Sequence, residues 1–118
     1  PRAARSTRAL DIMSSELQKI RERSVSPSEL VLSFDDAMQA LDLLQQRGAR
    51  VRGWEGWLRY PDGRLGHSER HQGTADLSAI AAAAAFELCR RSMREAHQAF
   101  RSAPDREASE LLFCITHQ

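Results

Sequence analysis

Residues 53–64 read Gly-Trp-Glu-Gly-Trp-Leu-Arg-Tyr-Pro-Asp-Gly-Arg and carry the clearest structural signal of the chain. Both tryptophans and the only tyrosine lie here, directly before Pro61-Asp62-Gly63. Such a tripeptide favours a turn because Pro fixes φ, Asp bonds to its own backbone and Gly accepts a left-handed conformation. The stretch therefore predicts a β-hairpin, with a first strand from Ala49 to Tyr60 and a polar second strand from Arg64 to Gln72.

Hydrophobic periodicity places helices on both sides of this hairpin. Helices are predicted from Leu10 to Arg23, from Ser33 to Gly48 and from Leu77 to Ser102. Ser33 is a candidate N-cap, and Gly48 is a candidate left-handed C-terminal residue. The apolar run 110–117 is typical of a central strand, whereas Leu30-Val31-Leu32 fits a short strand or an extended lead-in equally well.

This order of elements predicts an α+β fold. A small antiparallel sheet, made of the hairpin and the C-terminal strand, would pack against two long helices, with an extra N-terminal helix. The last strand would pair with the first strand of the hairpin and leave residues 64–72 at the edge. Residues 10–118 would form a single domain, and residues 1–9 a disordered or artificially added tail.

Composition narrows the function classes. The chain has 118 residues and a net charge of +1, which favours neither nucleic acid nor a membrane as partner. No apolar run reaches the roughly 18 residues of a membrane span, and the first residues lack the apolar core of a secretory signal. Two scattered cysteines, Cys89 and Cys114, are expected to be small buried hydrophobes in a reducing cytoplasm.

A three-residue hairpin loop fixes which side chains face each other. It predicts four cross-strand pairs: Tyr60 with Arg64, Trp57 with His67, Trp54 with Arg70, and Glu55 with Glu69. Facing acids are unfavourable unless a cation joins them, so Glu55 and Glu69 would form an anionic patch for a basic partner. Alternatively, the register differs by one residue and both acids are solvated.

Gly53 and Gly56 flank the first tryptophan, and two interpretations stay open. They mark either a bulge or a close approach of another backbone, or they make room for tryptophans in the core. One tryptophan is expected in the core and the other half exposed.

Catalytic signatures are absent. His67 and His71 could form a metal or acid–base cluster with Glu55 or Glu69, but residues four apart in a strand are about 13 Å apart. Phosphate loops, paired zinc histidines and a nucleophile elbow are also missing. We therefore expect no catalytic residue, metal or cofactor, and no enzyme activity. A small enzyme or ligand-binding domain that uses Glu55 with His67 and His71 is the alternative.

Several segments together resemble small bacterial immunity proteins, which are encoded beside polymorphic or type VI secretion toxins. The segments are Ser33-Phe34-Asp35-Asp36-Ala37 with a helix to Gly48, Gly53-Trp54-Glu55-Gly56-Trp57, Asp62-Gly63-Arg64 and Gln72-Gly73-Thr74. The resemblance covers residues 30–80 and transfers no functional residue. It implies a cytoplasmic, non-catalytic α+β protein that binds one cognate toxin and occludes its active site.

Aromatic anchors surrounded by arginine and acids are typical of interface hot spots. The predicted partner-binding residues are Trp54, Glu55, Trp57, Tyr60, His67, Glu69 and Arg70. Asp35, Asp36 and Asp42 form a second, acidic patch, since acids suit the basic cleft of an enzyme that handles phosphate-bearing substrates. Neither nucleic acid nor a membrane is expected as partner. A homodimeric adaptor that pairs through the edge strand or the first helix is a further alternative.

Overall fold

Three helices and four strands make up the computed structural model, which describes the backbone from Arg2 to Gln118 and the side chains from Asp11 onward. The elements are α1 (Arg2–Glu22), β1 (Leu30–Leu32), α2 (Phe34–Gln46), β2 (Val51–Arg59), β3 (Leu65–His67), α3 (Ala82–Ser102) and β4 (Glu110–His117). A 3₁₀ turn, Asp105–Glu107, links α3 to β4. The predicted α+β class is confirmed.

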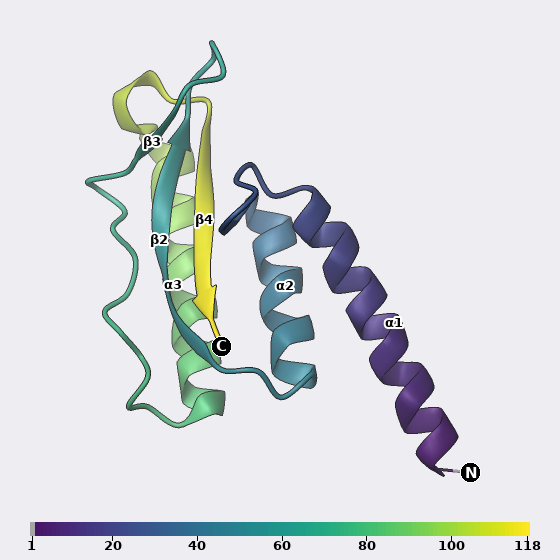
Figure 1. Ribbon diagram of the computed structural model, residues 1–118. Coiled ribbons are helices and arrows are strands. Elements are labelled where there is room, and N and C mark those ends of the chain that lie inside the picture. Colours follow the sequence, from purple (N-terminus) through teal and green to yellow (C-terminus); the bar gives the residue numbers. More distant parts are fainter. Residues whose placement is uncertain (1) are drawn as a thin grey trace.

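All strands lie in one antiparallel sheet with the order β1-β4-β2-β3 (Figure 1). The C-terminal strand pairs with β2, and β3 lies at the edge, as predicted. The ambiguous segment Leu30–Leu32 is a strand that pairs with β4. However, β3 contains three residues only, so the prediction of a strand from Arg64 to Gln72 is wrong.

The rest of that segment follows β2 as irregular chain. The amide of Ser68 donates to the Gly56 carbonyl oxygen at 2.9 Å. In turn, the Gly56 amide donates to the His71 carbonyl oxygen at 3.0 Å. Because Gly56 bonds to both residues, the two residues between them, 69 and 70, loop out of the ladder. Further along, the amide of Thr74 donates to the Trp54 carbonyl oxygen at 3.1 Å. The predicted pairs of Trp54 with Arg70 and of Glu55 with Glu69 therefore do not form.

This close approach of residues 71–74 to β2 explains the glycines. A Cβ atom on Gly56 would lie 2.2 Å from the carbonyl oxygen of His71. A Cβ atom on Gly53 would lie 2.6 Å from Thr74 Oγ1, and the pairing of β2 with β4 shifts register between Val51 and Gly53. Bulge and close approach are thus the correct interpretation of Gly53 and Gly56.

The same contact delays the third helix. Leu77 donates its amide to the Arg52 carbonyl oxygen at 2.7 Å, which ties this residue to β2. Asp76 accepts hydrogen bonds from the amide and hydroxyl of Ser78. The helix predicted from Leu77 consequently begins at Ala82.

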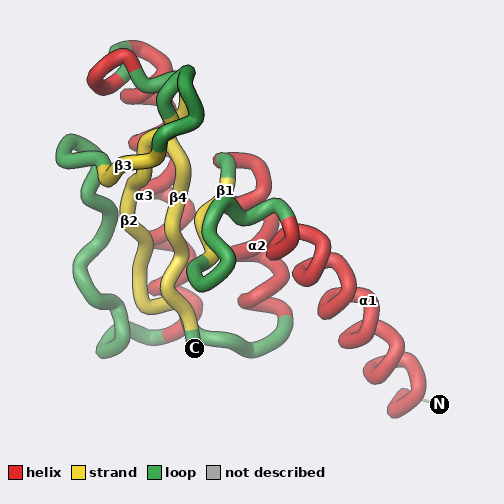
Figure 2. The backbone as a smooth tube through the Cα atoms, turned by 45° about the horizontal axis from the view of Figure 1, so that its top comes forward, coloured by secondary structure: helices red, strands yellow, loops and turns green. Residues whose placement is uncertain are grey.

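Helices α2 and α3 lie side by side against one face of the sheet (Figures 1 and 2). The main hydrophobic core fills the space between these two helices and the sheet. It includes Leu41, Leu58, Phe86, Met93 and Phe113, all at most 1% exposed. Gly48 ends α2 with φ +82°, as predicted, whereas the Ser33 side chain makes no capping hydrogen bond.

Helix α1 extends obliquely away from this body (Figure 1), and the structure with α1 included measures 54 × 30 × 24 Å along its principal axes. It is anchored near its C-terminal end by Leu17 and Ile20, which are buried. Its helical backbone begins at Arg2 and not at Leu10. The prediction of a tail outside the domain stays a prediction. Within the described residues, no helix combines the length and apolar character that a membrane crossing requires.

Candidate functional site

The pleat of β2 separates the two tryptophans. Trp54 points to the helices, is 4% exposed, and packs its ring 5.0 Å from that of Phe113. Its Nε1 donates to Ser92 Oγ at 3.1 Å. Trp54 is therefore a core residue and its prediction as a partner contact is wrong, whereas the expected division into one buried and one half-exposed tryptophan is confirmed.

Trp57 lies on the opposite face of the sheet, which no described helix covers. This surface, called the open face below, comprises Val31, Glu55, Trp57, Leu112 and Cys114. Val31, Leu112 and Cys114 form a small buried cluster of their own, and the partly buried side chains of Val25 and Trp57 pack over it. A sheet face without a helix thus gains its own apolar layer, with an aromatic ring at its outer surface.

The ring of Trp57 is held by two neighbours. The ring of His67 lies across the β2–β3 pair with a centroid distance of 4.9 Å, in the predicted register. Glu55 Oε1 accepts a hydrogen bond from Trp57 Nε1 at 3.4 Å. Glu55 and His67 are both exposed, and both line a hollow together with Glu69 and Gln72. Three predicted contact residues are thus brought together on the open face.

The acidic partner of Glu55 is Glu29 and not Glu69. Glu29 ends the loop before β1, and both carboxylates lie within 4.8 Å of each other and of the Cys114 sulfur. Glu69 instead forms a 2.8 Å ion pair with Arg106. Glu55 and Glu69 thus do not face each other as predicted, although both line the same hollow, and their role as an anionic patch stays a prediction. Sequence analysis missed Glu29 because only the strand order β1-β4-β2 places it beside Glu55.

Cys114 lies beneath this acidic pair. The residue is 3% exposed. Burial first, and then the negative charges of Glu29 and Glu55, raise the pKa of its thiol to about 12. At neutral pH the thiol is therefore protonated.

Tyr60 and Arg70 lie outside the open face. Tyr60 is partly buried against the main core, and the Arg64 guanidinium stands 5.1 Å from its ring centroid. Arg70 donates to the Ala103 carbonyl oxygen at 2.7 Å, and the predicted stacking of Arg70 on Trp54 gives way to that contact. Tyr60 and Arg70 therefore make contacts within the chain itself.

The two histidines of the predicted cluster are separated. His71 is 9% exposed and lies 6.5 Å from the Phe100 ring of α3, on the helix side, whereas His67 is on the open face. Burial, and then the nearby Arg70 charge, lower the pKa of His71. Ser68 lies close by, but its hydroxyl donates to Asp105 at 3.1 Å and accepts from the His71 amide, which is a structural arrangement.

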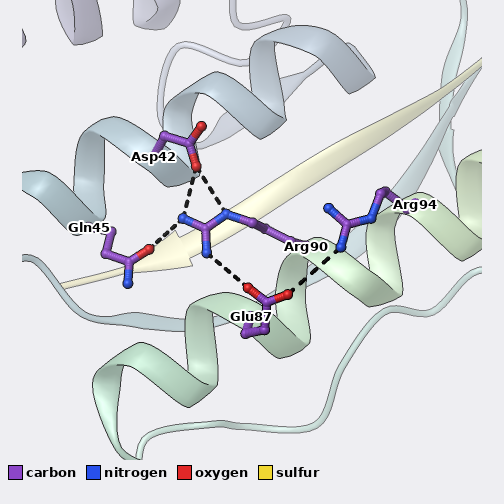
Figure 3. Close-up of polar contacts among 5 residues, drawn as sticks. All are labelled: Asp42, Gln45, Glu87, Arg90 and Arg94. Carbon is purple, nitrogen blue, oxygen red and sulfur yellow. Dashed lines mark hydrogen bonds and ion pairs between the residues drawn. The ribbon is translucent and has the colours of Figure 1, made fainter.

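The predicted acidic patch on α2 is neutralised by arginines. Asp36 makes two 2.9 Å hydrogen bonds to Arg23, which hold the pKa of its carboxyl below the ordinary value. Asp42 accepts from Arg90 of α3 at 3.0 Å (Figure 3). Of these three acids, only Asp35 has no ion pair among the described side chains, and the second acidic patch stays a prediction.

Searches of family models, curated proteins and solved structures found no match to this chain.

Proposed function

We propose that this chain is a cytoplasmic, non-catalytic immunity-type protein that binds a cognate toxin through its open face and occludes the toxin's active site. One observation carries the proposal. Trp57 lies half buried on a sheet face without a helix, flanked by the exposed residues Glu55 and His67.

The chemistry of this surface suits a basic, concave partner. A tryptophan supplies a large apolar area that the Glu55 and His67 contacts already hold in place, so little conformational entropy is lost on docking. Glu29 and Glu55 face each other without an arginine partner among the described side chains. A cationic side chain of the partner would relieve their repulsion, and clefts that bind phosphate-bearing substrates supply such cations.

Titration of the purified chain with the toxin encoded beside its gene tests the proposal. Calorimetry should show that Trp57→Ala costs at least about 2 kcal/mol of binding, as expected for a central aromatic anchor. Glu55→Arg should weaken binding and slow association, because it reverses the charge at the centre of the surface.

Glu95→Arg is the matched control. It reverses an exposed charge on α3, on the helix side of the sheet, and should leave the affinity unchanged. Equal affinities of wild type, Trp57→Ala and Glu55→Arg would contradict the open face as the contact surface. Absence of any complex with the neighbouring gene product would contradict the immunity-type function.

Self-association through α1 is a second candidate. Ile12 of this projecting helix is 54% exposed, the largest exposed fraction among the described large hydrophobic side chains. Two copies of the chain could bury the Ile12 side chains against each other.

A further inference from the structure

We propose that Cys114, Glu29 and Glu55 form a binding site for Zn²⁺ or a similar thiol-binding divalent cation. This site lies on the open face but goes beyond the proposed function, because the isolated chain would bind the metal without a protein partner. Its three ligands come from β4, from the loop before β1, and from β2.

The first support is the geometry of the donor atoms. One ligand atom from each residue lies within 4.8 Å of the other two. In a tetrahedral zinc site with bonds of about 2.0–2.3 Å, neighbouring ligand atoms are roughly 3.5 Å apart. The two glutamates are exposed, so a change of rotamer can close the remaining gap, whereas Cys114 is fixed by the sheet.

The second, independent support is the buried thiol. Cys114 is a free cysteine that is 3% exposed, and its sulfur lies within 4.8 Å of a carboxylate oxygen of both Glu29 and Glu55. It thus lies directly under two carboxylates and not among aliphatic side chains alone. A thiol that only filled space would gain nothing from acids at this distance, whereas a thiolate ligand would share their cation.

The surroundings prepare the carboxylates for a ligand role. Trp57 Nε1 donates to Glu55 Oε1, as the partners of metal-bound carboxylates do. The Glu29 backbone is fixed by two serines: its amide donates to Ser26 Oγ at 3.2 Å, and its carbonyl oxygen accepts from Ser24 Oγ at 2.7 Å. Some other acids, such as Asp36, Asp42 and Glu69, have arginine partners, whereas no ion pair of Glu29 or Glu55 occurs among the described side chains.

The donor set indicates the class of metal. One soft thiolate with two carboxylates favours zinc, whereas Mg²⁺ and Ca²⁺ prefer oxygen ligands alone. On binding, the Cys114 thiol transfers its proton to solvent, and the sulfur lone pair forms the bond to the metal. Three protein ligands leave a fourth position for water.

Cobalt substitution tests the site on the intact chain in reducing buffer. Titration with Co²⁺ should give a near-ultraviolet thiolate-to-cobalt charge-transfer band, which equimolar Zn²⁺ should abolish. Glu29→Gln should weaken binding by at least about 10-fold, the lower limit of what loss of a supporting partner costs at metal sites. Cys114→Ser should abolish the band.

Two variants serve as matched controls. Glu69→Gln neutralises an exposed acid outside the cluster, and Cys89→Ala removes the other buried thiol, which lies on the helix side. Both should retain the band and the affinity. Because Cys114 is buried, the exposed substitution Glu29→Gln keeps the test valid if Cys114→Ser does not fold.

Three results would overturn the proposal. They are the absence of saturable binding of Co²⁺ or Zn²⁺ to the wild type, binding without a charge-transfer band, and equal affinities of wild type and Glu29→Gln. The second result would indicate an acidic surface that attracts cations without the thiol. None of these results depends on the toxin, so failure here is distinguishable from failure of the proposed function.

Discussion

At the scale of the residue, Gly73 marks the tightest contact between two backbones. Its φ is +92°, and a Cβ atom there would lie 1.7 Å from the Trp54 carbonyl oxygen. Gly63, in the hairpin turn, has a similar φ of +90° but open space around it. Alanine substitutions at the two glycines therefore separate the free-energy cost of a left-handed backbone from the cost of a steric clash.

Gly63→Ala should lower the free energy of unfolding by about 1–2 kcal/mol, the cost of a left-handed non-glycine residue. Gly73→Ala pays the same cost and must in addition push residues 71–74 away from β2, which adds at least about 1–3 kcal/mol. Urea unfolding followed by tryptophan fluorescence gives both values. Equal losses in the two variants would contradict the close approach of these segments.

The register of the hairpin could be predicted from the turn residues as far as Trp57 and His67. Beyond His67 the prediction failed because Gly56 bonds to both Ser68 and His71. Turn chemistry fixes the pairs next to a turn, but a bulge further along depends on tertiary contacts. For this reason the sequence identified the Trp57–His67 pair and missed the pairing of Glu55 with Glu29.

At the scale of the element, Arg90 joins the two helices that cover the sheet. From α3 it contacts Asp42 and Gln45 of α2 and, within its own helix, Glu87 (Figure 3). Its side chain is 15% exposed, whereas that of Arg94 is 51% exposed and reaches Glu87 alone, at 3.8 Å. Desolvation makes the hydrogen bonds of Arg90 more costly to lose.

Arg90→Ala should therefore lower the free energy of unfolding by about 1–2 kcal/mol, the lower part of the range for charge-assisted hydrogen bonds because Asp42 is half exposed. Arg94→Ala should cost less than about 0.5 kcal/mol, as is typical of an exposed ion pair. Thermal unfolding followed by circular dichroism compares the two variants. If Arg94→Ala proved as damaging as Arg90→Ala, the loss in Arg90→Ala could not be assigned to its contacts between α2 and α3.

Periodicity was sufficient to predict the helical segments, but their ends depended on contacts with the sheet. Apolar spacing predicted helix α3, and its buried residues include Met93, Ala96 and Phe100. It could not show that Leu77 bonds to Arg52, which holds the chain against β2 until Ala82. In the same way, Asp42 looked like a free surface acid because its partner, Arg90, lies on another helix.

At the scale of the whole molecule, antiparallel pairing of distant segments produces the open face. Strand β4 lies between β1 and β2, so Cys114 is flanked by Val31 on one side and Glu55 on the other. This arrangement cannot be predicted from the spacing of the cysteines or from the charge pattern along the sequence. The candidate site could be predicted in part, through the hairpin, and its remaining members depend on the strand order.

The sheet edges argue against self-association through strands. The Ser24–Glu29 loop covers the outer side of β1, where Ser24 Oγ accepts from the Val31 amide at 2.9 Å and Val25 donates to the Val31 carbonyl oxygen at 3.1 Å. Residues 68–77 cover β2, and β3 presents an edge of three residues only. Short and covered edges prevent the edge-to-edge pairing that longer, open strands allow.

We therefore expect light scattering coupled to size exclusion to give the monomer mass of 13.3 kDa. A dimer mass would favour the second candidate function, since α1 is the described element that extends furthest from the body (Figure 1). Ile12→Glu then distinguishes the two routes to a dimer: it places a charge on the exposed side of α1 and should restore the monomer if the helices pair. A dimer that persists in this variant would contradict the α1 interface and would require association through another surface, either a sheet edge or the open face.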